Sequence, residues 1–96
     1  MERILALRKK VDEVDERILY CLRERVDICK IIGAIKRKHG IPVRDSRREG
    51  DVYSNIFRKA SKLGLNLDEV KAIYQKIMEM SASAQKTDTK TQGSIT

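Results

Sequence analysis

The sequence predicts an all-α protein of three helices, the first of which is very long. From Ile4 to Ile35, apolar residues recur at alternating spacings of three and four, which is the period of a helix face. No segment shows the sustained apolar and polar alternation of a half-buried strand. Gly40 and Pro42 follow the repeat and are typical of a helix end, so we expect the first helix over about residues 2–38.

Two shorter helices are expected after the long one, over residues 46–63 and 67–85. Each begins with a capping pair, in which the cap residue is followed by Glu three positions later. The two pairs are Ser46 with Glu49 and Asn66 with Glu69. Residues 1–85 are therefore expected to form one helical domain. Residues 86–96 are mostly Thr, Lys, Gln and Ser, a composition that predicts a disordered tail.

The 96-residue chain is basic, with 21 Lys and Arg against 14 Asp and Glu and a net charge of +7. Such a charge attracts anions of any kind, from metabolites to nucleic acid. Three Tyr and one Phe are too few for base-stacking surfaces, which makes nucleic acid an unfavoured partner. Cys21 and Cys29 lie too far apart on one helix for a disulfide and are expected to stay reduced. With no apolar run of signal-peptide or membrane-spanning length, we expect a cytoplasmic protein without a membrane partner.

Arg25 interrupts the apolar repeat of the first helix. A guanidinium stays protonated in proteins, and burying it without a partner costs several kcal/mol. No Asp or Glu lies on the same stripe, so an anionic ligand is the simplest counterion. Lys36 follows eleven residues later, about 16 Å along the axis and on nearly the same face, so both side chains can reach one small ligand.

The length of the first helix favours a homodimer. So long an amphipathic helix is hard to cover with two shorter helices of the same chain alone, whereas a second copy that pairs in coiled-coil fashion can cover it. Arg8 lies seventeen residues before Arg25, about 25 Å along the axis, and cannot reach the same ligand within one chain. If a two-fold axis passes near Tyr20, the partner subunit's Arg8 falls between Arg25 and Lys36. The alternative is a monomeric bundle whose first helix breaks near Gly33.

Several short motifs follow one another along the chain in a specific order. They are Leu7-Arg8-Lys9-Lys10, the Arg25 position, Gly33-Ala34-Ile35-Lys36, Arg44-Asp45-Ser46-Arg47-Arg48-Glu49, and Ser81 with Gln85 four residues later. This ordered set resembles the small all-helical chorismate mutases over about residues 4–85. The resemblance implies an intertwined homodimer whose long first helices cross, and in which each active site borrows one arginine from the partner chain.

The resemblance also implies an activity, the rearrangement of chorismate to prephenate in the biosynthesis of Phe and Tyr, with no cofactor and no metal. It assigns the two substrate carboxylates to Arg25 and the partner subunit's Arg8. Arg48 and Ser81 are expected to help them.

The remaining roles implied by the resemblance concern the ring hydroxyl and the breaking bond. Glu49, with the backbone at Asp45, is expected to hold the hydroxyl. Lys36 and Gln85 are expected to hydrogen-bond the ether oxygen. Arg25, Lys36, Glu49 and Gln85 are thus the predicted catalytic residues.

Two other functions remain open from the sequence. An isochorismate-pyruvate lyase resembles the same scaffold, and the Asp45 and Glu49 pair favours the mutase without deciding the matter. A non-catalytic basic dimer, binding nucleic acid or acting as a regulatory module, predicts cations spread over an exposed face. The position of Arg25 within the apolar repeat argues against that reading. Docking to another enzyme of the pathway is also left open.

Overall fold

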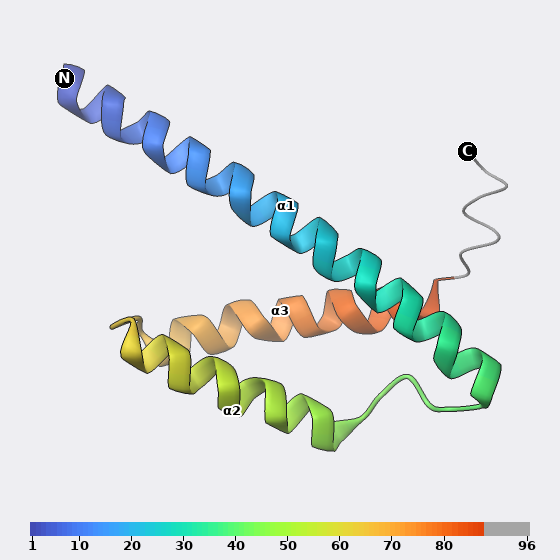
Figure 1. Ribbon diagram of the computed structural model, residues 1–96. Helices are drawn as coiled ribbons and strands as arrows, with labels where there is room; N and C mark the ends of the chain where they lie inside the picture. The colour runs from blue at the N-terminus through green and yellow to red at the C-terminus, as the bar shows by residue number, and fades with distance from the viewer. Residues whose placement is uncertain (88–96) are drawn as a thin grey trace, which may run out of the picture.

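The computed structural model describes residues 1–87, which form three helices (Figure 1). Helix α1 spans Glu2–His39, α2 spans Ser46–Lys62 and α3 spans Leu67–Lys86. The predicted all-α fold with a very long first helix is confirmed. Lys86, the first residue of the predicted tail, belongs to α3, and residues 88–96 of that tail lie outside the described residues.

The long helix α1 runs without a break for 38 residues, through Gly33, so the alternative of a helix broken there is wrong. It ends at Gly40, which adopts the left-handed conformation with φ of 66° that a side chain disfavours. The amide of Ile41 then donates to the carbonyl of Lys36 at 2.8 Å and satisfies one of the last carbonyls of the helix. No helix of the described residues is both long and apolar enough to cross a membrane.

The cap residue of α2 lies one position earlier than the sequence predicts. The cap is Asp45 and not Ser46, because Asp45 has the extended backbone of a cap residue and its Oδ1 accepts from the amide of Arg48 at 3.0 Å. Ser46 is the first helical residue. At α3 the predicted cap is correct, since Asn66 Oδ1 accepts from the amide of Glu69 at 3.0 Å.

Helix α3 packs against the C-terminal half of α1, and α2 packs against α3 (Figure 1). The molecule extends 55 × 36 × 15 Å along its principal axes and is therefore flat and elongated. Few side chains can be buried in so thin an arrangement. The buried residues lie mainly where α1 meets α3, and they are Cys29, Gly33, Ala60, Ser81 and Ala84.

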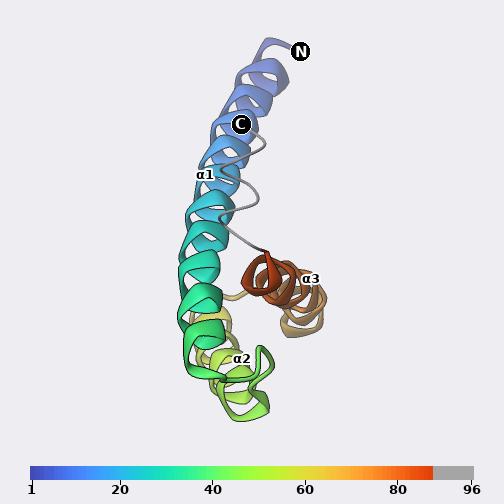
Figure 2. The ribbon, with the colours of Figure 1, turned by 90° about the vertical axis from the view of Figure 1, so that its right-hand side faces the viewer.

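The N-terminal half of α1 extends alone past the other two helices, as both views show (Figure 2). Its apolar repeat is exposed in the single chain. We call this surface the N-terminal stripe, and it consists of Ile4, Leu7, Val11, Val14 and Ile18, with exposures between 41% and 58%. Further along, α1 meets α3 through Arg25 of the same repeat, which contacts Ser81, and through Gly33, which is buried against the backbone of Gln85.

Candidate active site

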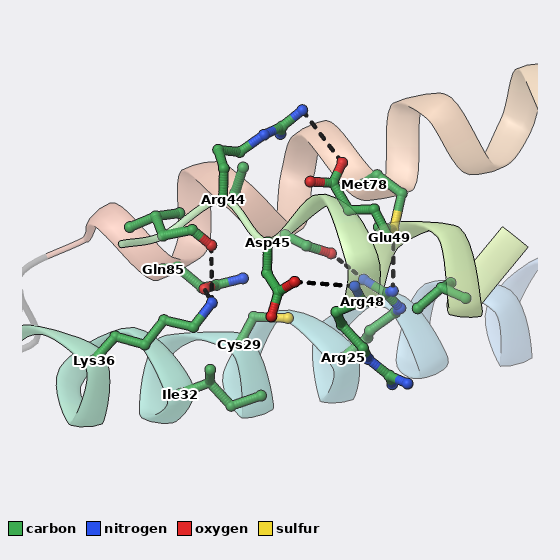
Figure 3. Close-up of a pocket in the computed structure, with 14 residues that line it drawn as sticks. Arg25, Cys29, Ile32, Lys36, Arg44, Asp45, Arg48, Glu49, Met78 and Gln85 are labelled. Atoms are coloured by element: carbon green, nitrogen blue, oxygen red, sulfur yellow. Dashed lines mark hydrogen bonds and ion pairs between the residues drawn. The ribbon is translucent and has the colours of Figure 1, made fainter. Parts of the chain in front are cut away.

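A cavity of about 320 Å³ lies where the C-terminal half of α1, the start of α2 and the end of α3 come together (Figure 3). Every predicted site residue except Arg8 lines it. These are Arg25, Lys36, Asp45, Arg48, Glu49, Ser81 and Gln85. The volume is near the lower end of the range for small-molecule pockets, about 300 Å³.

Lys36 and Gln85 meet at one end of the cavity. The Nζ of Lys36 donates to Oε1 of Gln85 at 2.7 Å and to the carbonyl of Val43 at 2.8 Å. Lys36 comes from the last turn of α1 and Gln85 from the end of α3. Because an ammonium carries three N–H groups, one donor of Lys36 is left for a ligand.

Arg25 stands toward the other end of the cavity, beside α3. Its Nη1 donates to Oγ of Ser81, and its Nη2 lies 3.7 Å from Sδ of Met78. The hydroxyl of Ser81 in turn donates to the carbonyl of Ile77 at 2.9 Å. Within residues 1–87, Arg25 forms no ion pair. Among the described residues, this half-buried guanidinium therefore has only neutral partners, and it is available to an anion.

The first turn of α2 supplies the third wall of the cavity. Asp45 uses one carboxylate oxygen to cap the helix, and this contact fixes the backbone that carries Arg48 and Glu49. The Oε1 of Glu49 lies 3.3 Å from Nη2 of Arg44, and the Glu49 side chain is 25% exposed whereas that of Arg44 is 62% exposed. The dipole of α2 also favours a carboxylate in its first turn.

The side chains that line the cavity carry an excess of positive charge. Four of them are cations and two are carboxylates, namely Arg25, Lys36, Arg44 and Arg48 against Asp45 and Glu49. A net excess of two positive charges is complementary to a dianion. In the described part of the chain, no group of His, Cys, Asp and Glu is placed to hold a metal ion.

Comparison with known proteins identifies a family. The model of the chorismate mutase type II family matches residues 7–86, which is most of the chain. This chain belongs to the chorismate mutase type II family. The family resemblance inferred from the motifs is thereby confirmed, and so is the prediction that the protein is an enzyme of the isomerase class.

Three similar proteins illustrate the range of this family match. A chorismate mutase of Methanocaldococcus jannaschii is 31% identical over 90% of this chain and 87% of its own length. A 4-amino-4-deoxychorismate mutase of Streptomyces pristinaespiralis is 34% identical over 76% of this chain and 57% of its own length. A solved structure, a conserved hypothetical protein from Pyrococcus furiosus, superposes with a TM-score of 0.70 at 29% identity and covers 90% of this chain and 99% of that one.

The cavity also contains residues that sequence reasoning missed. Arg44 pairs with Glu49, Met78 contacts Arg25, and Cys29 lines the wall between Arg25 and Lys36. Cys29 could have been found from its spacing, since it lies one helical turn after Arg25. The position of Arg44 directly before Asp45 was weaker evidence for a place in the cavity. No sequence feature indicated Met78.

Arg8 is the predicted site residue that does not line this cavity of the single chain. It is exposed on the N-terminal half of α1, about 25 Å along the axis from Arg25. A single chain therefore leaves this predicted residue outside the cavity.

Proposed function

We propose that the cavity converts chorismate to prephenate. The observation that carries this proposal is the presence of two features in one small cavity. Arg25 is a cation with no anionic partner among residues 1–87, and Lys36 and Gln85 form a pair of donors. The first can bind a carboxylate of the substrate. The second can stabilise an oxygen on which charge develops.

The reaction requires little covalent chemistry from the protein. One carbon–oxygen ether bond of the substrate breaks while one carbon–carbon bond forms, and both changes occur within a single molecule. The enzyme must hold the compact conformer in which the enolpyruvyl side chain lies over the ring. It must also stabilise the negative charge that develops on the ether oxygen in the transition state.

Arg25 and Arg48 supply the first of these effects by binding carboxylates of the substrate. Paired guanidinium and carboxylate groups restrict geometry as well as adding affinity, because the planar fork accepts only a narrow range of approaches. Ser81 holds Nη1 of Arg25, which orients the guanidinium before the substrate arrives. Less of the free energy of substrate binding is then lost in ordering this side chain.

Lys36 and Gln85 supply the second effect. Two acceptors hold Lys36 in place, so its remaining N–H is directed before the reaction begins. Because Oε1 of Gln85 is occupied by Lys36, the amide nitrogen of Gln85 is the group left to donate. A cation and a neutral donor aimed at one oxygen match the charge that forms there.

Glu49 is proposed to accept a hydrogen bond from the ring hydroxyl. The amino substrate named for the Streptomyces relative carries a basic nitrogen at the corresponding place, which makes it the second candidate substrate. The Arg44 guanidinium, 3.3 Å from Glu49, offsets the carboxylate charge and repels an ammonium group. This ion pair favours the hydroxyl-bearing substrate.

A second copy of the chain is proposed to complete each cavity. The exposed N-terminal stripe provides an apolar surface for pairing, and surfaces of this kind mark protein–protein contacts. Antiparallel pairing about an axis near Tyr20 brings the partner subunit's Arg8 level with Ile32, which lines the cavity between Arg25 and Lys36. Each dimer would then contain two sites with an additional guanidinium.

The proposal is tested by incubating the purified protein with chorismate and following its disappearance, with Arg25→Ala as the variant control. Prephenate formation that is lost in Arg25→Ala supports the proposal, and absence of turnover contradicts it. Parallel incubations with isochorismate and 4-amino-4-deoxychorismate compare the alternatives. Release of pyruvate from isochorismate in preference to the chorismate reaction would assign the lyase activity instead.

A further inference from the structure

We propose that Gly33 and Arg37 are positioning residues that hold the last turn of α3 so that Gln85 meets Lys36 correctly. This inference rests on the proposed role of Gln85 at the ether oxygen. Neither residue belongs to the site predicted from the sequence, and neither lines the cavity. Both contact the backbone of Gln85 from α1.

Arg37 binds the end of α3 at two points. Its Nη1 donates to the carbonyl of Gln85 at 2.5 Å, and its Nη2 donates to the carbonyl of Thr87 at 3.1 Å. The last carbonyls of a helix have no partner within the helix, and a cation beside them is also favoured by the helix dipole. Arg37 therefore ties a turn that would otherwise tend to fray.

Thr87 donates to two further carbonyls at the end of α3. Its Oγ1 donates to the carbonyl of Ser83 and its amide to the carbonyl of Ala84, both at 3.1 Å. Together with Arg37, these contacts give the carbonyls of residues 83, 84 and 85 a donor each. A helix end with its acceptors satisfied in this way is a defined structure, and Gln85 lies within it.

Gly33 sets how closely α1 and α3 approach at this turn. A β-carbon at position 33 would overlap the carbonyl oxygen and Cα of Gln85, so only glycine permits the observed contact. Gly33 is buried, and its neighbour across the contact is backbone, which cannot rotate aside as a flexible side chain can. A larger residue must push α3 away from α1.

The three contacts of Gln85 with α1 come from one face of a single stretch of helix. Gly33 meets its backbone, Lys36 binds its side chain and Arg37 binds its carbonyl. Residues at spacings of three and four lie on the same side of a helix, so one rigid element fixes both the backbone and the amide of Gln85. Figure 3 shows Gln85 and Lys36 directed toward one another at this end of the cavity.

Displacement of Gln85 should change kcat more than it changes KM. A donor acting mainly in the transition state affects kcat when it is displaced, whereas substrate affinity depends on the arginines at other places in the cavity. Small misplacements are costly, since a shift of about 1 Å can lower a rate by about a hundredfold. Loosening the Gln85 turn should therefore lower kcat more than it raises KM.

The test begins with Arg37→Ala, with Lys38→Ala as the matched loss of charge in the same turn. Within the described residues, the side chain of Lys38 forms no hydrogen bond and no ion pair. We expect Arg37→Ala to lower kcat about tenfold or more with little change in KM. Arg37→Lys should recover part of the loss, because an ammonium can still donate to one carbonyl. Wild-type kcat in Arg37→Ala would overturn the role of Arg37.

Gly33→Ala forms the second arm, with Gly50→Ala as its control. A β-carbon at Gly50, which is exposed in α2, meets nothing within 4 Å. Gly33→Ala should lower kcat, whereas Gly50→Ala should keep wild-type kcat and a melting temperature at least as high as the parent. A folded Gly33→Ala protein with wild-type kcat would overturn the role of Gly33. If Gly33→Ala does not fold, the Arg37 series decides the proposal alone.

A double-mutant cycle separates this inference from the proposed function. In a Gln85→Ala background, Arg37→Ala should cause no further loss of kcat, because the group that it positions is absent. An equal loss in both backgrounds would show that Arg37 acts elsewhere. If Gln85→Ala itself keeps wild-type kcat, the proposed role of Gln85 is wrong and the positioning role falls with it.

Discussion

The Nζ of Lys36 lies 2.7 Å from Oε1 of Gln85, a contact that joins the last turn of α1 to the end of α3 across 49 positions of sequence. With the second contact of Lys36 to Val43, one N–H of Lys36 and the amide NH2 of Gln85 remain free to donate to a ligand. Both donors are in place before any ligand binds. Such preorganisation is the usual source of large electrostatic effects on a reaction barrier.

Replacing Lys36 by alanine should lower kcat far more than it alters folding. Removing one preorganised donor costs about 3 kcal/mol or more of barrier, a loss on the order of a hundredfold or more in rate. The check is kcat for chorismate, with thermal unfolding to monitor the fold. Lys71→Ala, a charge loss on the exposed side of α3, is the control. Near-wild-type kcat in Lys36→Ala would rule out its assignment.

Replacing Gln85 by glutamate should make kcat depend on pH, with higher activity at lower pH. A carboxylic acid donates a hydrogen bond only while protonated, and its ordinary pKa of about 4.3 leaves almost none in that form at pH 8. The protonated fraction rises as pH falls, so kcat of the variant relative to the parent should be higher at pH 5 than at pH 8. Gln75→Glu, outside the cavity, should show no such trend. Equal relative activity at both pH values would contradict the contact with the ether oxygen.

The helices could be predicted because their determinants are local. The apolar period and the glycine at position 40 are properties of neighbouring residues, and they predicted the long α1 and its end. The cap of α2 was misplaced by one residue because Asp45 and Ser46 are both good caps. The capping box with Glu49 favoured Ser46, but the side chain of Asp45 reaches the amide of Arg48 instead.

The contacts of Arg37 and Arg44 could not be predicted in the same way. Arg37 lies among four consecutive basic residues, from Lys36 to His39, and nothing local distinguishes it. Its role follows from the distance at which α3 crosses α1, which Gly33 permits. Arg44 was visible in the sequence only as part of a motif. Its pairing with Glu49 depends on how the chain enters α2.

Replacing Arg44 by alanine should change the choice between substrates. Removing this guanidinium leaves the Glu49 carboxylate without the ion pair at 3.3 Å, so an ammonium group is better tolerated beside it. The ratio of kcat/KM for 4-amino-4-deoxychorismate to that for chorismate should rise several-fold. Arg47→Ala, a charge loss in the same segment but outside the cavity, serves as control. An unchanged ratio in Arg44→Ala would show that this ion pair does not determine the substrate.

Mixing two inactive variants should restore activity if each site uses both chains. Arg8→Ala and Arg25→Ala each remove one guanidinium from every site of their own homodimer. In a heterodimer of the two, one site lacks both arginines and the other has both. Random pairing makes about half of the dimers mixed, so the co-refolded mixture should recover about a quarter of wild-type activity.

The same experiment distinguishes a shared site from a site within one chain. If Arg8 acted in the cavity of its own chain, every site in the mixture would still lack one arginine, and mixing would restore nothing. Mixing Arg25→Ala with Lys36→Ala is the matched control, because these two residues line the cavity of the same chain and cannot complement one another.

Sedimentation of the parent protein should show a dimer, which the exposed N-terminal stripe favours. A stable, active monomer would contradict the shared site, since a lone chain cannot bring Arg8 within about 25 Å of Arg25 along a continuous helix.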